Sequence, residues 1–375
     1  MNGIARGDNS IVGRWWWTVD RGLLLALLTL MAVGLVLVII ASPGVAERID
    51  APTFHFVKRH LILLPIAIIL MVGCSLLTPR QTRLLALALL ALAVIGLVAT
   101  LFIGSEIKGA RRWISIGGFS LQASEFAKPA MTVLAAWMLT QFQRKEMKGY
   151  LIGALLVFII PLCLTAIQPD VGTSAVMSAV FGAQLFIAGI SLWAVAIILG
   201  IGAGGFWLTY LFVPHVTSRV DRFLDPATGD TYQIDMSLNA FHTGGLVGRG
   251  PGDGVIKNAL PDAHSDFIFA VAGEELGLIA CLAIVGIFAF IVLKTFLRSL
   301  SQGDLFTMLA GAGLASLFGA QAIVNLGSTL ALIPTKGMTL PFVSYGGSSL
   351  FSLAIAMGLA LAITRRDTSL GDQKE

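Results

Sequence analysis

One carboxylate occupies a position suited to acid–base chemistry. Asp266 ends a polar, glycine-rich stretch and is followed directly by the apolar run Phe267-Ile-Phe-Ala-Val. A carboxylate at such a boundary is partly removed from water, which favours proton uptake and makes it a stronger general base near neutral pH. The alternative is that Asp266 only caps the helix that follows, because helix N-termini favour acidic side chains. Asp266 is therefore a candidate general base.

A second stretch, KGARRWISIGGFSLQASEFAKP at residues 108–129, carries positive charge. Arg111, Arg112 and Lys128 could bind an anionic head group. Trp113 could contribute to that site, although a tryptophan here also suits a simple anchor at the membrane interface. Lys128 falls in an apolar run and needs a partner, and Glu125 lies three residues back on the same helix face.

A third stretch, residues 244–266, is rich in glycine and leads into Asp266. Arg249 and Lys257 among these glycines resemble a flexible basic cradle for phosphate, and His264 lies where the cradle meets the apolar run. The Gly-Lys-Ser/Thr ending of a nucleotide-binding loop is missing. Glu274 and Glu275 lie deeper in the same run, and we expect them to satisfy partners on other helices.

Two further polar segments interrupt the apolar chain. Asp170 lies in the turn Gln168-Pro-Asp-Val-Gly-Thr, where it could cap the next helix or adjoin a phosphate at the helix N-terminus. The segment IPTKGMTLPFVSYGGSS at residues 333–349 contains Lys336 and Ser344, and its prolines and glycines prevent a continuous helix. It could line a cavity, or it could be a structural turn only.

The elements that position these groups are membrane helices. Of the 375 residues 56% are hydrophobic and 12% are charged, which excludes a soluble globular enzyme. The sequence predicts an all-α polytopic membrane protein of about ten transmembrane helices. Apolar runs mark them at about 22–41, 61–77, 84–105, 125–142, 150–167, 173–190, 191–213, 267–293, 305–333 and 347–364.

An even number of spans places both termini on one side of the membrane. Basic residues in the short loops favour the cytoplasm for that side. The expected organisation is an N-terminal cytoplasmic tail (1–21), a transmembrane domain (22–364) and a C-terminal cytoplasmic tail (365–375). A long loop at about 214–265 joins the seventh and eighth helices on the outer side. Because most loops in helical bundles are short, we expect this one to be ordered and functional.

The candidate groups together suit a polyanionic lipid. Cations and a carboxylate at the outer membrane surface fit a lipid diphosphate and a hydroxyl to be deprotonated. Glycosyl transfer from a lipid-diphosphate sugar matches this inventory, and transport of the same lipid would use the cations without the base. The small net charge of +4 does not suggest nucleic acid as a partner.

Four motifs resemble one family. KGARRWISIGGFSLQASEFAKP, QPDVGTS, LPDAHSDFIFAVAGEELG and LIPTKGMTLPFVSYGGSS are similar, in this order, to the SEDS proteins of bacterial wall synthesis. The resemblance runs from Arg21 to about Arg366, and the last motif resembles the cell-division branch more than the elongation branch. Ser265 replaces the usual threonine before the carboxylate, and the segment after Asn325 also departs from the family pattern.

The resemblance implies a peptidoglycan glycosyltransferase that polymerises lipid II. Asp266 matches the carboxylate that the family is held to use as its catalytic base. A class B penicillin-binding transpeptidase and other divisome proteins are the implied partners. A divalent cation (Mg²⁺ or Mn²⁺) could bind at the diphosphate, although the sequence predicts no certain cofactor. A lipid II flippase and a non-catalytic divisome scaffold remain as alternatives.

Overall fold

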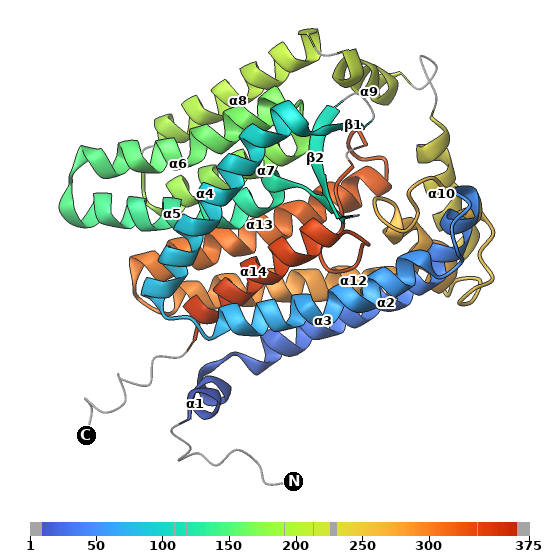
Figure 1. The fold of residues 1–375 in the computed structure, drawn as a ribbon, viewed down its shortest axis with the longest axis horizontal. Helices are drawn as coiled ribbons and strands as arrows, with labels where there is room; N and C mark the ends of the chain where they lie inside the picture. Colours follow the sequence, from blue (N-terminus) through green and yellow to red (C-terminus); the bar gives the residue numbers. More distant parts are fainter. Residues whose placement is uncertain are drawn as a thin grey trace.

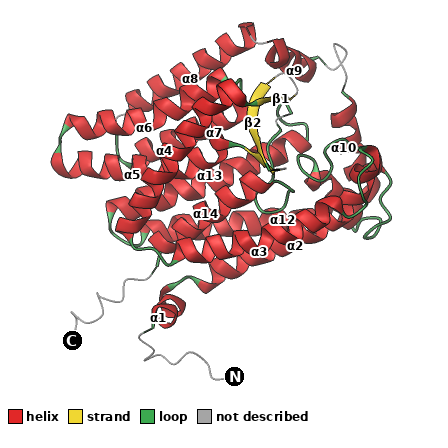
Figure 2. Ribbon diagram, viewed as in Figure 1, coloured by secondary structure: helices red, strands yellow, loops and turns green. Residues whose placement is uncertain are grey.

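The computed structural model is a bundle of long helices (Figures 1 and 2). It describes residues 10–107, 110–117, 119–190, 192–212, 214–225, 231–335 and 337–365. Each predicted apolar run coincides with a helix: α2 (Arg21–Arg48), α3 (His55–Ser75), α4 (Pro79–Ile103), α5 (Ala123–Lys145), α6 (Lys148–Ile167), α7 (Val171–Ile187), α8 (Leu192–Phe212), α12 (Ile268–Leu300), α13 (Leu305–Thr329) and α14 (Gly347–Ile363).

Local sequence explains where several of these helices begin. Asp20 accepts from Leu23 N at the start of α2, and Asp304 accepts from Thr307 N at the start of α13. Thr78 forms a capping box with Gln81 at the start of α4. These side chains satisfy backbone N–H groups that have no partner within the helix.

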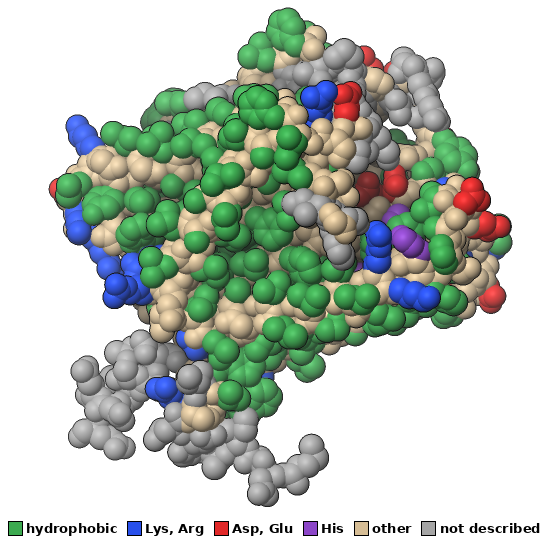
Figure 3. Space-filling model, viewed as in Figure 1, with side chains coloured by type: hydrophobic (Ala, Val, Ile, Leu, Met, Phe, Trp, Pro, Cys, Tyr) green, Lys and Arg blue, Asp and Glu red, His purple; other side chains and the backbone are tan. Residues whose placement is uncertain are grey.

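The apolar surface of the bundle faces outward. Within the described ranges six helices are long and apolar enough to cross a membrane: α2, α3, α4, α6, α12 and α13. The apolar windows of α4 and α6 are only 22% buried, whereas that of α13 is 67% buried. Hydrophobic side chains cover the visible flank (Figure 3). Exposed apolar helix faces of this extent require lipid, so the chain is a polytopic membrane protein.

The core forms around α13 and α14. α13 packs against α5, α7 and α12, and α14 packs against α3 and α5. The short helix α1 (Ile11–Thr18) lies within the predicted N-terminal tail and contacts the core through Trp15, whose Nε1 donates to Ser75 Oγ at 2.8 Å. α1 and the C-terminal end of α14 lie at the same end of the bundle (Figure 1). The predicted tail residues 1–9 and 366–375 lie outside the described residues.

The opposite end carries structure that the all-α prediction did not include. Three short strands, β1 (Ser105–Ile107), β2 (Ala110–Ile116) and β3 (Phe119–Leu121), form an antiparallel sheet in the order β1-β2-β3. β2 pairs with both neighbours and carries Arg111, Arg112 and Trp113. Pairing between the strands satisfies backbone groups of β2 on both of its sides. We call this part of the bundle the sheet end.

The segment predicted as a long loop is also partly helical. It contains α9 (Pro214–Leu224), α10 (Tyr232–Gly244) and the single turn α11 (Ile256–Ala259). α10 packs against α12, and α11 packs against α2 and α10. In Figure 1, α9 and α10 lie at the sheet end.

Candidate functional site

A cavity with a volume of about 440 Å³ opens at the sheet end of the bundle. Figure 3 shows acidic, basic and histidine side chains gathered around a hollow there. α3, α5, α7, the sheet, the turn before α12 and the segment before α14 all contribute to its wall. The charged and aromatic residues of this wall are Phe56, Arg59, Arg112, Trp113, Glu125, Asp170, Asp262, Asp266, Phe267 and Tyr345.

Asp266 is half-buried in the wall of this cavity. It lies just outside α12, one residue before the N-cap position, which Phe267 occupies. Asn325 on α13 donates through Nδ2 to Asp266 O at 2.9 Å and to Met338 O at 2.7 Å. A Cβ placed on Gly337 would lie 3.3 Å from Asp266 Oδ2, so the carboxylate adjoins the segment before α14.

The turn that carries Asp266 is joined to the segment before α14. Ser344 donates through Oγ to Ser265 O and accepts from Leu340 N at 2.8 Å. Tyr345 N donates to His264 O at 2.9 Å. Ser344, a predicted substrate contact, is buried and holds this junction together.

Glu125 and Lys128 form the predicted pair. Lys128 Nζ lies 2.8 Å from Glu125 Oε1 and donates at 2.8 Å to Gln321 Oε1 on α13. Only 1% of the Lys128 surface is exposed, and Glu125 lines the cavity whereas Lys128 does not. Gln321 continues through Nε2 to Ser349 Oγ at 3.2 Å. A buried lysine paired in this way is neutralised locally, so it contributes little free positive charge to the cavity.

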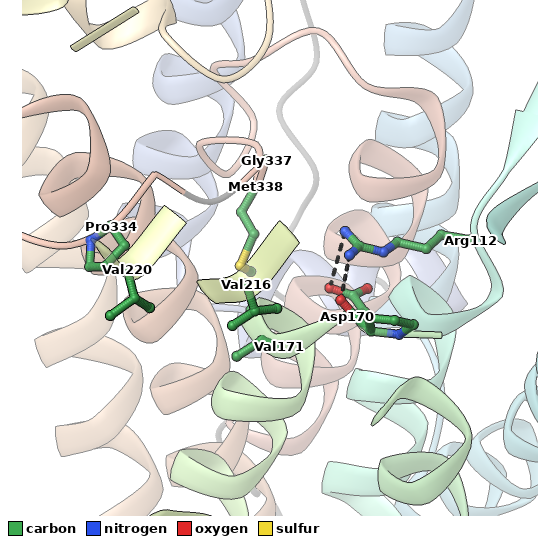
Figure 4. Close-up of a pocket in the computed structure, with 10 residues that line it drawn as sticks. Arg112, Asp170, Val171, Val216, Val220, Pro334, Gly337 and Met338 are labelled. Carbon is green, nitrogen blue, oxygen red and sulfur yellow. Dashed lines mark hydrogen bonds and ion pairs between the residues drawn. The ribbon is translucent and has the colours of Figure 1, made fainter. Parts of the chain in front are cut away.

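Arg112 and Asp170 meet at the boundary between the sheet and α7 (Figure 4). Arg112 donates through Nε to Gln168 O at 3.2 Å and through Nη2 to Pro169 O. Its Nη1 lies 3.9 Å from Asp170 Oδ1. Asp170 caps α7 by accepting from Thr173 N at 3.4 Å, and its Oδ2 accepts from Gln122 Nε2 at 3.2 Å. Asp170 thus both caps its helix and lines the cavity, and it fixes the guanidinium beside the helix N-terminus.

Three predicted cations are not brought together with these residues. Arg111 is exposed and lies 3.5 Å from Glu106 Oε2. Arg249 is exposed in the glycine-rich segment, away from the described cavity lining. Lys257 pairs with Glu275 and donates to Gly252 O at 3.1 Å. Lys336 lies outside the described residues.

The glycine-rich segment binds carboxylates of its own chain where we expected a phosphate cradle. Glu274 accepts from Val255 N and Ile256 N at 2.7 Å and from Lys257 N at 2.8 Å. Glu275 accepts from Gly254 N at 3.1 Å and from Gly252 N. The two acids therefore bind residues 252–257, and the predicted partners on another helix are those of the short helix α11. Successive backbone N–H groups form an anion site that two buried carboxylates already fill.

A break in α12 makes this contact possible. Gly277 has φ 77° and ψ −178°, a conformation essentially confined to glycine. The loop pairs with the freed backbone, since Leu278 N donates to Gly245 O at 2.9 Å and Arg249 N donates to Glu274 O at 3.0 Å. No signal in the sequence marked Gly277 as different from other membrane glycines.

Sequence reasoning missed part of the cavity wall. Phe56 and Arg59 on α3 line it together with Tyr345. The cluster FVKRH at residues 56–60, at the start of an apolar run, was an available signal. His264 is buried behind Phe56 and Tyr345 rather than in the cavity lining, and burial lowers its pKa to about 4. Burial also raises the pKa of the Tyr345 phenol, against the opposing effect of Arg59.

Comparison with known proteins identifies the family. The sequence matches the model of the FtsW, RodA and SpoVE cell cycle proteins over residues 21–369. The chain belongs to this family. A probable peptidoglycan glycosyltransferase FtsW of Caulobacter vibrioides is 42% identical over 364 residues, covering 97% of this chain and 93% of the relative. One from Coxiella burnetii is 37% identical over 359 residues, covering 92% of this chain and 96% of the relative. These relatives carry the division-branch name, as the sequence motifs predicted.

Solved structures of the family share the fold. A structure described as a peptidoglycan synthase complex coordinating polymerization and crosslinking matches with a TM-score of 0.74 and 26% identity, covering 93% of this chain and 98% of that one. The rod shape determining protein RodA of Thermus thermophilus matches with a TM-score of 0.68 and 26% identity, covering 93% of this chain and 97% of RodA. The helical arrangement around the cavity is therefore a family property.

Proposed function

We propose that this chain is a peptidoglycan glycosyltransferase that polymerises lipid II into glycan strands during septal wall synthesis. One observation carries the proposal beyond family membership. A carboxylate, Asp266, lines a cavity together with two arginines, Arg59 and Arg112, at one end of a membrane bundle. A base for a sugar hydroxyl and positive charge for a diphosphate are the two requirements of this transfer.

In the proposed reaction, Asp266 accepts the proton of the 4-hydroxyl of the acceptor GlcNAc. That oxygen forms a bond to the anomeric carbon of the donor MurNAc on the face opposite the leaving group. The bond from that carbon to oxygen of undecaprenyl diphosphate breaks, and its electron pair leaves with the diphosphate. Arg112, fixed by Asp170 at the start of α7, stabilises the negative charge that develops there. The configuration inverts, which one displacement with one base requires.

The proposed placement in the membrane is supported by the apolar helices and by the basic residues of the short loops. We propose that the ten apolar helices cross the bacterial cytoplasmic membrane, that both termini lie in the cytoplasm, and that the sheet end with its cavity faces outward. A class B penicillin-binding transpeptidase is the proposed partner, supported by the structural likeness to a synthase complex that couples polymerization and crosslinking. Other divisome proteins complete the proposed assembly.

A divalent cation at the diphosphate is compatible with the cavity. Within the described ranges no three His, Cys, Asp or Glu side chains come together to hold a metal ion. Mg²⁺ bound to a phosphate substrate typically takes only one or two protein carboxylates. Asp170, which lines the cavity beside Arg112, would supply one. Such an ion would neutralise the charge of the leaving diphosphate.

The decisive experiment is polymerisation of lipid II by the purified protein with its transpeptidase. We expect glycan strands from the wild-type protein and none from Asp266→Asn, with thermal stability and transpeptidase binding unchanged. Asp253 is an exposed acid of the glycine-rich segment, and Asp253→Asn is the matched control. This variant should polymerise lipid II normally. Strand synthesis by Asp266→Asn at the wild-type rate would refute the catalytic role of Asp266.

The same proteins distinguish polymerisation from lipid transport. A flippase would move lipid II across a vesicle bilayer without making strands, and Asp266→Asn would transport normally. A scaffold would give neither activity, and cells would tolerate the substitution. Of these three outcomes, only strand synthesis by the wild-type protein with its transpeptidase agrees with the proposal.

A further inference from the structure

A cluster of aromatic rings borders the cavity beside Asp266. The rings of Phe56 and His264 are 4.2 Å apart, and those of Phe56 and Tyr345 are 5.2 Å apart in an edge-to-face arrangement. His264 and Tyr345 are 5.3 Å apart. Phe56 and Tyr345 are half-buried and line the cavity, while His264 is buried behind them. Phe56 and Tyr345 thus present aromatic surface to the cavity on its α3 side, whereas Trp113 lines it beside Arg112 on the sheet.

This cluster belongs to the same rigid unit as the proposed base. Tyr345 N donates to His264 O at 2.9 Å, two residues before Asp266. Arg59 lies on α3 about one helical turn from Phe56 and also lines the cavity. The backbone of Tyr345 is therefore joined to the turn that carries Asp266.

Aromatic faces next to a base suit a sugar ring. The C–H bonds on one face of a pyranose carry partial positive charge, and an aromatic face carries partial negative charge. Stacking orients the sugar while leaving its hydroxyl groups free at the ring edge. Rigid aromatic side chains also lose little conformational entropy on binding. A diphosphate gains nothing from such a surface and requires cations, which Arg112 provides at the boundary of the sheet and α7.

We propose that Phe56 and Tyr345 form the subsite for the acceptor sugar, the GlcNAc whose 4-hydroxyl gives its proton to Asp266. This assignment rests on the proposed function and divides the cavity into two parts. The α3 side with Phe56, Arg59 and Tyr345 holds the acceptor sugar. The side with Arg112 and Asp170 holds the donor diphosphate.

The test measures sugar binding separately from turnover. The probe is the soluble GlcNAc–MurNAc disaccharide, which lacks lipid and diphosphate, and binding to the purified protein is followed by saturation-transfer NMR. We expect Phe56→Ala and Tyr345→Ala each to weaken binding by about tenfold. Tyr345→Phe keeps the ring and should bind within about twofold of the wild-type protein. Asp266→Asn should bind the disaccharide although it makes no strands.

Phe54→Ala is the matched control. Phe54 is an exposed aromatic at the N-cap of α3, two residues from Phe56 and outside the described cavity lining. The Phe54→Ala variant should bind the disaccharide and polymerise lipid II as the wild-type protein does. In the polymerisation assay, Phe56→Ala and Tyr345→Ala should raise the KM for lipid II by about tenfold with a smaller change in kcat.

Each outcome separates this inference from the proposed function. Wild-type binding of the disaccharide by both alanine variants, or an equal loss in Phe54→Ala, overturns the sugar subsite even if lipid II is polymerised. Absence of polymerisation by the wild-type protein with transpeptidase overturns the proposed function. If disaccharide binding then still depends on Phe56 and Tyr345, the sugar subsite stands without it.

Discussion

Substituting the two partners of the Lys257–Glu275 ion pair should lower the stability of the fold by unequal amounts. Glu275 is fully buried and Lys257 is 6% exposed. Glu275→Gln removes the only carboxylate paired with Lys257 in the described residues and leaves a buried ammonium, at a cost of about 3–5 kcal/mol. Lys257→Met leaves Glu275 with two backbone donors, Gly252 N and Gly254 N, so the cost should be lower, about 1.5–3 kcal/mol.

The double variant provides the sharper prediction. Lys257→Met with Glu275→Gln removes the unpaired charge, so its stability should exceed that of Glu275→Gln alone. We expect a coupling of about 1–3 kcal/mol, as for contacting residues in one network. Thermal unfolding in detergent measures the order of stability, and limited proteolysis of residues 244–257 reports whether the loop stays docked. Lys148→Met, an exposed cation at the start of α6, is the control and should unfold like the wild-type protein.

Two results would refute this reasoning. Equal unfolding midpoints for Glu275→Gln and the double variant would show that the pair carries no buried charge. Loss of lipid II polymerisation in Lys257→Met at an unchanged midpoint would return Lys257 to the role of phosphate contact that its sequence context suggests.

Two further predictions concern the break in α12 and the buried histidine. Gly277→Ala should lower the unfolding midpoint, because φ at this residue is 77° and a Cβ would lie 2.3 Å from Gly248 N. Gly286→Ala in the same helix places its Cβ in open space and should leave the midpoint unchanged. Equal midpoints for the two variants would contradict the predicted strain at Gly277. Burial lowers the pKa of His264 from an ordinary value of 6.5 to about 4, with Asp262 opposing the shift. The folded state therefore binds fewer protons, and its stability should be full above pH 6.5 and fall as the pH drops towards 4, by about 2 kcal/mol at pH 5. His264→Gln should lose this part of the pH dependence in thermal unfolding at pH 8 and pH 5, and an unaltered slope would exclude His264 as its source.

The sequence by itself determined the membrane character and the positions of the helices. Apolar runs mark the helices because a segment in lipid must satisfy its backbone internally and present apolar side chains outward. Local ion pairs could also be predicted from the sequence, as Lys128 shows. A lysine in an apolar run requires a partner, and Glu125 at helical spacing was that partner because the contact is local.

Only the tertiary structure decided which charged groups share the cavity. Asp266, Arg112 and Asp170 meet there although about 100 residues separate Asp266 from Asp170. Lys257, nine residues from Asp266, instead pairs with Glu275. Its direction depends on the break at Gly277 and on the loop folding back along α12, and neither leaves a periodic signal.

The aromatic part of the wall was decided in the same way. Phe56 looked like one more apolar residue at a helix end, and it lines the cavity because α3 packs against α14 and the segment that carries Tyr345. Local spacing determines secondary structure and short-range pairs. Long-range packing decides which side chains are brought together, because it depends on the whole set of helix contacts and not on any one stretch of the chain.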